Sequence, residues 1–508
     1  MKRIVVAACL LAALFPPLTF SIPRPQASAT RAREYRKAHE AEIIAELTDL
    51  LSIPNVASDT VNIRRNAARL IEMMSRRGIE ARLLEGKGSP AIFGELKTPG
   101  ATRTVGIYAH YDGQPVEPSK WSSDPFKPTL RDKPLEAGGR NIPFPRAGEK
   151  FDPEWRIYAR SASDDKAPII AVLAALDALK ASNAKPTSNL KFLLDGEEEA
   201  GSPHLGDIVN RNAQLLGADV WICADGPVHQ SRRQQLYFGV RGIVKVDITV
   251  YGANRALHSG HYGNWSPNPG MRLAKLLASM KDDNGRVLVE GFYDGAVPLG
   301  AEEKKALKEM PDTDADLMRE YGLAATDGGG RSLGELINEP SLNIDGLRSE
   351  DVGRQSRTII PAEATATVDL RLVKGIEPRR QVDRLIAHIK KQGYFVVGEE
   401  PNAETRLKHP LIARVASEEG YPAVRTPMNL PIVKQIINAV ERAIGRQPVM
   451  LPTMGGSGPL WAIDVATKAP QVGVPIVNHD NNQHSSNENL RIQNLWDGIE
   501  IFAALLTM

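Results

Sequence analysis

The chain has 508 residues, which is enough for more than one domain, and 42% of them are hydrophobic, as in an ordinary globular protein. Its 63 lysine and arginine residues nearly balance 61 acidic residues, so the formal net charge is only +2. This balance gives no support for a nucleic-acid partner or for binding to an anionic membrane surface, and neither is expected.

The first residues have the layout of a secretory signal. Lys2 and Arg3 precede the apolar run 4–15, which is too short for a stable membrane span. The Ala-Ser-Ala triplet at 27–29 offers a cleavage site. A signal peptide over residues 1–29 is therefore predicted, and with it a secreted protein of the periplasm.

The hydrophobic periodicity that follows predicts an α/β chain. Apolar residues at helical spacing indicate helices within 30–52 and 62–78, and apolar runs predict strands at 92–96 and 104–110. The stretch 114–155 is rich in proline, glycine and charge, so it is predicted to be a long loop without regular structure.

A strand, a turn and a helix then recur. Over 155–182 a short strand leads to two adjacent aspartates and an apolar helix, and strands are predicted at 190–194 and 219–225. From about residue 239 the pattern changes to that of an α+β insert. Further elements are predicted at 243–252, 271–280, 364–373, 379–392, 431–445, 471–477 and 491–507.

These elements predict two domains. The first is an α/β domain in two parts, 30–238 and 425–508, and the second is an α+β domain inserted over 239–424.

Polar side chains follow several of the predicted strands. His110 and Asp112 are separated by one residue, so in an extended chain both point to the same side, and one could bind a metal while the other orients it. Asp164, Glu199 and Asp225 also follow strands. Because ligands bind beyond the carboxyl ends of strands in an open α/β sheet, these side chains are expected to converge.

Histidine and carboxylate ligands without thiolates suit zinc in a hydrolytic site, with cobalt or manganese as substitutes. The candidate ligands are His110, Asp164, Glu199, Asp225 and His484. This set could hold two metals bridged by one carboxylate, which would polarise a carbonyl and lower the pKa of a water. Glu198 is the candidate general base. Taken singly, each motif is also typical of structural features, such as an aspartate that caps a helix or an acidic helix start.

The motifs HYD, SDDK, GEEEAGS, the strand-ending Asp225, LHSG and QHSSNE occur in an order that resembles a dinuclear zinc peptidase family. That family contains aminoacylase, acetylornithine deacetylase, succinyl-diaminopimelate desuccinylase, glutamate carboxypeptidase and the carnosinase and PepV-type dipeptidases. The motifs are most similar to those of the last group. The resemblance implies a zinc-exopeptidase-like catalytic domain with helices on both faces of a central sheet. The insert would be a lid and dimerisation domain.

The resemblance also implies a role for each residue of the site. Asp164 would bridge two zinc ions in each subunit, with His110 and Asp225 on one ion and Glu199 and His484 on the other. Glu198 would be the base, and Asp112 would orient His110 within the catalytic group. The peptide bond between Asp164 and Asp165 would be cis.

Four residues, three of the insert and one of the final segment, would contact the substrate. His258 would reach across a homodimer to stabilise the oxyanion, and Thr358 and Arg371 would bind the terminal carboxylate of the substrate, assisted by Ser457. One departure from the family is that 159–168 lacks the usual glycines, so its turn must use other residues.

The predicted function is hydrolysis of a dipeptide, or of the C-terminal residue of a short peptide. An N-acyl amino acid deacylase is the alternative within the family. A catalytically silent peptide-binding homologue is the alternative outside enzymes, although such a protein would have no need of Glu198.

Overall fold

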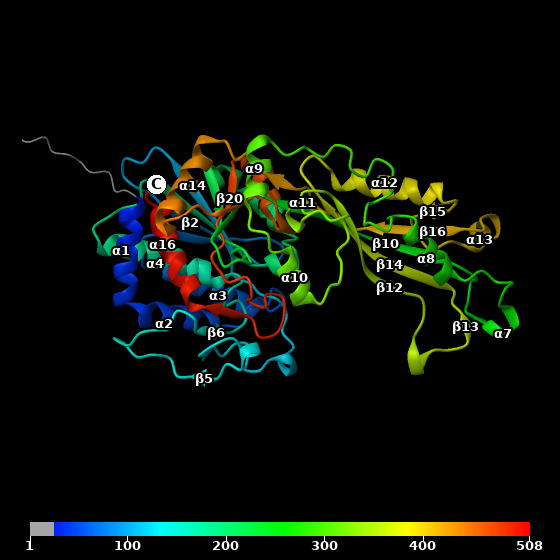
Figure 1. The fold of residues 1–508 in the computed structure, drawn as a ribbon, viewed down its shortest axis with the longest axis horizontal. Coiled ribbons are helices and arrows are strands. Elements are labelled where there is room, and N and C mark those ends of the chain that lie inside the picture. The colour runs from blue at the N-terminus through cyan, green and yellow to red at the C-terminus, as the bar shows by residue number, and fades with distance from the viewer. Residues whose placement is uncertain (1–24) are drawn as a thin grey trace, which may run out of the picture.

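The computed structural model describes residues 25–508, and Figure 1 shows them as two lobes side by side. The predicted leader over 1–29 therefore falls mostly outside the described residues. Its cleavage triplet at 27–29 lies in helix α1 (Pro25–Ala38), where Ser28 and Ala29 are buried. The hydroxyl of Ser28 accepts a hydrogen bond from Thr507 at 2.8 Å.

The first lobe is built on an eight-stranded sheet whose strand order is β1-β2-β7-β3-β8-β20-β9-β18. The strands are β1 (Glu80–Leu84), β2 (Ala91–Leu96), β3 (Thr104–His110), β7 (Asn189–Asp195), β8 (Val220–Cys223), β9 (Gln235–Tyr237), β18 (Val449–Leu451) and β20 (Gln471–Gly473). Strands β7, β3, β8 and β20 run parallel, so their carboxyl ends meet at one edge of the sheet. In this register His110 lies opposite Asp195.

Helices cover both faces of this sheet, which confirms the predicted fold class. One face packs against α1, α2 (Glu40–Leu51), α3 (Thr60–Ser75), α4 (Lys166–Ala181), α14 (Pro431–Ile444) and α16 (Ile492–Leu505). The other packs against α5 (Leu205–Arg211), α6 (Ala213–Leu216) and α15 (Leu460–Thr467). Alternate residues of β3 enter the two cores, with Ile107 in one and Tyr108 in the other, as the pleat of a strand requires.

The second lobe contains a seven-stranded sheet with the path β12-β14-β10-β16-β15. Its strands are β10 (Gly239–Tyr251), β12 (Ser341–Arg348), β14 (Glu363–Leu372), β15 (Phe395–Val397), β16 (Ile412–Ser417), β17 (Val424–Arg425) and β19 (Met454–Ser457). Helices α8 (Pro269–Ala278) and α12 (Pro378–Lys391) bury their apolar sides against one face. The domain bounds at 239 and 424 stay a prediction.

Short elements complete the second lobe and its junction with the first. A small ribbon of β11 (Leu257–His258) and β13 (Ile359–Ile360) lies with α7 (Ser259–Tyr262) at the end of the lobe farthest from the first (Figure 1). Helices α9 (Ala301–Glu309), α10 (Asp314–Tyr321) and α11 (Leu333–Leu336) lie between α8 and β12 in the chain, and α13 (Ala403–Lys408) precedes β16.

Three predictions from the sequence need correction. The stretch 114–155 is not without structure, because β4 (Thr129–Arg131) and β5 (Asn141–Ile142) join β6 (Arg156–Tyr158) and β21 (Asn489–Arg491) in a four-stranded sheet. The single helix predicted within 30–52 is two helices that separate at His39. The strand predicted at 471–477 ends at Gly473.

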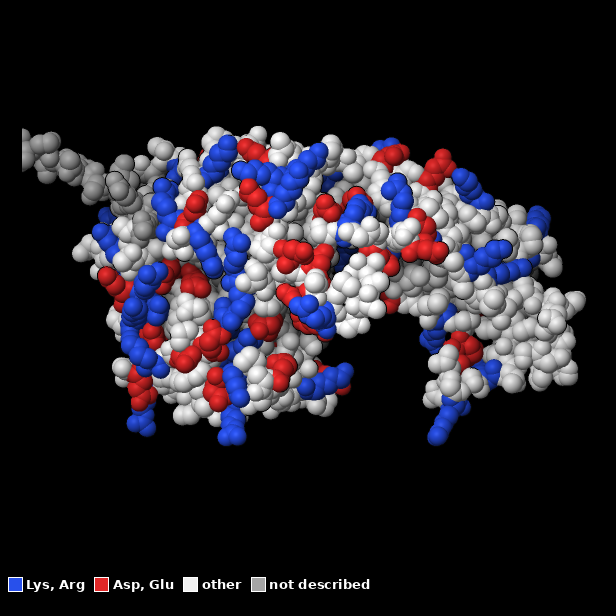
Figure 2. All heavy atoms as spheres, viewed as in Figure 1, with Lys and Arg blue, Asp and Glu red and all other residues white. Residues whose placement is uncertain are grey.

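No helix among residues 25–508 is long and apolar enough to cross a membrane. Figure 2 shows that acidic and basic side chains are interspersed over the face in view, and that a hollow separates the lower parts of the two lobes.

Candidate active site

The end of β3 places His110 in the interior, at the edge where the parallel strands end. Its side chain is fully buried, and its Nε2 lies 2.8 Å from Oδ1 of Asp164. Asp164 comes from the turn between β6 and α4, and the peptide bond from Asp164 to Asp165 is cis. Asp225, just after β8, completes a group with these two in which the potential ligand atoms all lie within 4.8 Å of one another.

A second group shares Asp164. Nε2 of His484 lies 3.3 Å from Oδ2 of Asp164 and 3.1 Å from Oε2 of Glu199. The ligand atoms of Asp164, Glu199 and His484 also lie within 4.8 Å of one another. The structure thus brings together all five candidate ligands, in two groups joined by one carboxylate.

Asp112 connects the strand end with the acidic turn. Its Oδ1 lies 3.3 Å from Nδ1 of His110, as expected for a group that orients the imidazole. The same carboxylate accepts hydrogen bonds from the backbone N–H groups of Glu198 and Glu199, both at 3.0 Å. One buried side chain therefore sets the position of the first histidine and of the turn η3 (Glu198–Ala200).

The charges in the site favour binding of cations. Burial, followed by the charge of Asp164, raises the pKa of Asp225 to about 7. Burial also raises the pKa of Glu198 well above its usual range. Oε1 of Glu199 is buried with no hydrogen-bond partner among the described residues. Crowded carboxylates and an orphaned oxygen beside two imidazoles are a donor set that fits two divalent metals.

The pKa of His484 is raised as well, and for a histidine this shift favours the charged form. Hydrogen bonds to Asp164 and Glu199 raise its pKa to about 11 in the metal-free chain. Its backbone has a φ of 59°, so the loop after Val477 must turn sharply to aim the ring at the two carboxylates.

Two amides that sequence reasoning missed also touch the ligands. Nε2 of Gln114 donates to Oε2 of Glu199 at 2.7 Å, and Nε2 of Gln483 donates to Oδ2 of Asp164 at 3.2 Å. Gln483 precedes His484 in the chain, and Gln114 follows the His-x-Asp motif, so both were next to recognised motifs.

Glu488 was missed as well, although it lies in the QHSSNE motif. Its buried carboxylate accepts hydrogen bonds from the backbone N–H groups of Ser161, Ser163 and Asp164 at 2.8 to 2.9 Å, and from Arg160 at 2.9 Å. Ser161 adopts a φ of 61°, a conformation that normally favours glycine. Glu488 thus holds the glycine-free turn from which Asp164 projects.

The neighbouring acid Glu197 faces away from the ligands. It accepts hydrogen bonds from the backbone N–H groups of Ser89 at 3.1 Å and His204 at 2.7 Å, and it pairs with the His204 ring. The role of Glu197 is therefore to hold the acidic turn in place.

The predicted substrate-binding residues divide into two sets. Nη1 of Arg371 donates to Oγ of Ser457 at 2.9 Å. A methyl group built on the next residue, Gly458, would lie 3.9 Å from Oε1 of Glu198, so this pair lies beside the candidate base. His258 and Thr358 are exposed at the far end of the second lobe, and the structure does not bring them to the metal ligands of the same chain.

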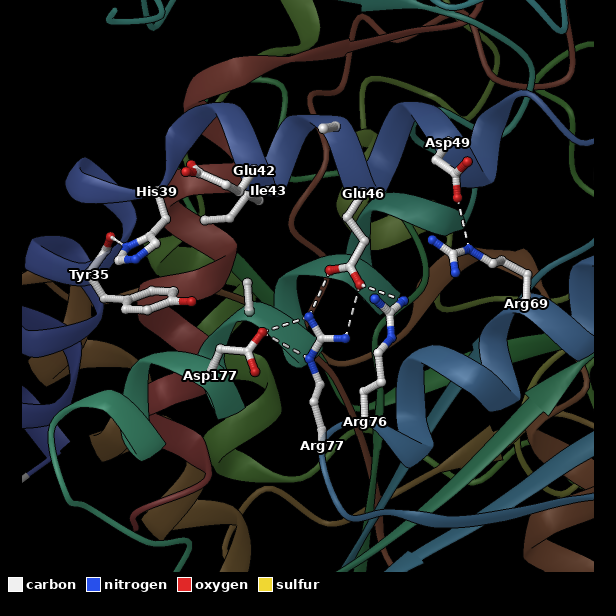
Figure 3. Close-up of a pocket in the computed structure, with 12 residues that line it drawn as sticks. Tyr35, His39, Glu42, Ile43, Glu46, Asp49, Arg69, Arg76, Arg77 and Asp177 are labelled. Atoms are coloured by element: carbon white, nitrogen blue, oxygen red, sulfur yellow. Dashed lines mark hydrogen bonds and ion pairs between the residues drawn. The ribbon is translucent and has the colours of Figure 1, made fainter. Parts of the chain in front are cut away.

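A separate cavity of about 380 Å³ opens between α2, α3 and α4, away from this site. Figure 3 shows ion pairs among the charged side chains that line it: Arg77 binds Glu46 and Asp177, and Arg69 binds Asp49. We interpret this cavity as a structural ion-pair network.

The sheet, the two joined ligand groups and the adjacent acid together define a metal-dependent hydrolase. The model of the peptidase family M20/M25/M40 matches residues 106–508. The chain belongs to this family, which confirms the resemblance seen in the motifs.

Named relatives and a solved structure agree with this assignment. The Cys-Gly metallodipeptidase of Schizosaccharomyces pombe is 26% identical over 482 residues, which cover 91% of this chain and 94% of the relative. Human Beta-Ala-His dipeptidase is 25% identical over 534 residues, covering 98% and 97%. An M20 family metallo-carboxypeptidase from Sulfolobus solfataricus superposes with a TM-score of 0.76 at 28% identity, over 92% of this chain and 98% of that one.

The protein is a metal-dependent dipeptidase of this family. This function is better supported than the two alternatives, a deacylase and a catalytically silent peptide-binding protein. Members of the family bind two metal ions.

The prediction of a secreted, periplasmic protein was wrong. The yeast Cys-Gly metallodipeptidases, which align with 91–92% of this chain, are cytosolic enzymes. Cleavage after Ala29 would also remove residues that pack in α1.

Proposed function

We propose that the protein is a zinc dipeptidase with two zinc ions in each subunit, for which cobalt or manganese can substitute. The observation that carries this proposal is the pair of ligand groups joined by Asp164. His110 and Asp225 would hold one ion, and Glu199 and His484 the other. The absence of thiolate from this set favours zinc in a hydrolytic role over zinc in a structural one.

The chemistry divides between the metals and the protein. Two bound zinc ions would supply a polarised scissile carbonyl and a water of lowered pKa. Glu198 takes the proton from that water and gives it to the leaving amine, which requires a carboxyl group whose pKa is raised from its ordinary value. Burial has this effect on Glu198. Asp112 keeps Glu198 in place through its backbone N–H.

We assign substrate selection to Arg371 and Ser457, which lie beside Glu198. Arg371 carries a guanidinium group suited to a carboxylate, and it is held by Ser457. A carboxylate bound beside the base would belong to the C-terminal residue of a dipeptide, as in the dipeptides named for the relatives.

The second lobe is proposed to be a lid that forms a homodimer. His258 and Thr358 are exposed on its far end, together with large apolar side chains such as Trp265, which is 80% exposed, and Val352, which is 84% exposed. Pairing of two lids would cover these surfaces. It would also bring His258 of one chain to the oxyanion, and Thr358 to the substrate carboxylate, in the active site of the other.

The test is hydrolysis of a panel of dipeptides and N-acyl amino acids by zinc-loaded protein and by Glu198→Gln. We expect cleavage of dipeptides with a free carboxylate, and a loss of kcat of about 10²–10⁴-fold in the variant with zinc content unchanged. Metal analysis of both proteins is the control. Cleavage of acyl amino acids alone would assign the deacylase function instead, and an active Glu198→Gln would refute the base.

A further inference from the structure

Tyr421 and Arg371 lie on opposite sides of strand β10 in the second lobe. Its N–H donates to the carbonyl of Ile243 in β10 at 2.9 Å, and the N–H of Ile243 donates back to the carbonyl of Tyr421 at 3.0 Å. On its other side Ile243 pairs with Arg371 of β14. The three residues are therefore neighbours across adjacent extended segments.

The ring of Tyr421 is held in place before any substrate binds. It stacks on Trp461 with ring centroids 5.9 Å apart and an angle of 14° between the planes. Trp461 belongs to α15, directly after the loop that carries Ser457. A methyl group on Gly242 would clash with the carbonyl oxygen of Tyr421, so the backbone here approaches β10 closely.

Tyr421 and Arg371 each lie directly opposite Ile243 in an antiparallel pair, so their side chains lie on the same face of the sheet. Burial is the main cause that raises the pKa of Tyr421 to about 12, and the charge of Glu198 adds to it, whereas Arg371 and a hydrogen bond with Ser457 act in the other direction. Because this pKa lies far above neutral pH, the phenol is a neutral O–H donor at neutral pH.

Arg371 by itself leaves a carboxylate incompletely bound. Its Nε donates to Asp369 at 2.7 Å and its Nη1 to Ser457 at 2.9 Å. Among residues 25–508, no group accepts a hydrogen bond from Nη2 of Arg371, so this nitrogen is available to bind a ligand. A carboxylate offers about four lone-pair sites and therefore has room for a second donor.

We propose that Tyr421 is a substrate-binding residue whose phenol O–H donates to the terminal carboxylate of the dipeptide beside Arg371. This inference rests on the proposed function of Arg371. It adds a specificity contact that favours substrates with a free C-terminal carboxylate over those whose C-terminus is an amide.

The test compares the parent with Tyr421→Phe on a dipeptide and on the same dipeptide with an amidated C-terminus. Loss of one hydrogen bond to a charged group should raise KM for the free dipeptide about tenfold, with kcat changed by less than about twofold. The kcat/KM for the amidated dipeptide should be unchanged. Calorimetric titration of both ligands into zinc-loaded Glu198→Gln, with and without Tyr421→Phe, should show the same tenfold loss in affinity for the free dipeptide only.

Tyr394→Phe is the matched control, because that phenol donates to the carbonyl of Arg272 at 3.1 Å within the second lobe. This variant should change neither KM nor kcat for either substrate. A fall in kcat at constant KM, equal losses on both ligands, or no change in Tyr421→Phe would overturn the inference. If the parent cleaves no dipeptide, the proposed function fails, and the titration still decides the role of Tyr421.

Discussion

At the residue scale, two acids of the site, Glu198 and Asp225, are held in an environment that opposes their ionisation in the metal-free chain. Asp225 shows this most clearly, because burial and the nearby charge of Asp164 raise its pKa from 3.8 to about 7. An aspartate that binds a metal must be ionised, so a proton competes with the metal ion for this carboxylate.

The shift predicts how the stability of the metal-free protein depends on pH. A carboxyl group whose pKa is higher in the folded chain stabilises the fold below its unfolded pKa, and that contribution is lost as pH rises through the folded pKa. We therefore expect the Tm of chelator-treated protein to fall between about pH 4 and pH 7, the interval between the ordinary pKa of 3.8 and the folded pKa of about 7 for Asp225. Differential scanning calorimetry of parent and Asp225→Asn, both metal-free, measures the effect. An equally steep fall in the variant would contradict the assignment.

At the scale of elements, one carboxylate joins a strand to a turn. Asp112 accepts hydrogen bonds from the backbone of Glu198 and Glu199 while it faces the ring of His110. Residues that orient metal ligands in this way affect both metal affinity and activity.

Asp112→Asn should weaken zinc binding by about 10–100-fold, because an amide offers one acceptor oxygen where two are used. Competition with a chelating dye measures the affinity. Asp59→Asn is the control, since Asp59 caps α3 with its side chain away from the ligands and asparagine caps equally well. Unchanged affinity in Asp112→Asn would show that the turn does not depend on this carboxylate.

The ion-pair network of Figure 3 joins α2, the end of α3 and α4 behind the catalytic sheet. Arg77, whose side chain is only 10% exposed, binds Glu46 at 2.7 Å and Asp177 at 2.6 Å. Arg76 is 52% exposed and lies 3.7 Å from Glu46.

Arg77→Met should lower the free energy of unfolding by about 2 kcal/mol, because two partly buried carboxylates lose their shared partner. The neighbouring Arg76→Met should change it by less than about 0.5 kcal/mol, as is usual for an exposed pair. Urea denaturation of the two variants gives the comparison. Equal effects would mean that burial does not set the strength of this network.

At the scale of the whole molecule, the proposed role of His258 would make one chain incomplete by itself, because this residue is separated from the metal ligands. The two lie in different lobes, with His258 on the end farthest from the first lobe (Figure 1). A dimer in which each lid serves the other chain would resolve this separation.

Mixed dimers test this arrangement. Glu198→Gln and His258→Ala should each be nearly inactive, and refolding them together in equal amounts should restore about a quarter of the parent activity. Half of the dimers are then mixed, and in each of these one of two sites holds both intact residues. Activity no higher than that of the separate variants would argue against a shared site, and sedimentation of each variant controls for assembly.

Much of the fold could be predicted because the apolar runs near residues 104–110 and 190–194 belong to parallel strands buried on both faces, which have a distinctive pattern. The family followed from the order of short motifs. The stretch 114–155 was misread because β4 and β5 are only three and two residues long, and they exist through pairing with β6 rather than through their own composition.

The sequence by itself determined the kinds of ligand, the acid that can serve as base and the family, because these reside in side-chain chemistry and local spacing. Only the tertiary structure decided which other residues hold the site. Glu488 reaches the backbone of Asp164 across 324 residues, and the pairing of separate segments with Ile243 places Tyr421 and Arg371 on one face of the sheet. No local pattern records such contacts, because they arise only when distant segments pack into one core.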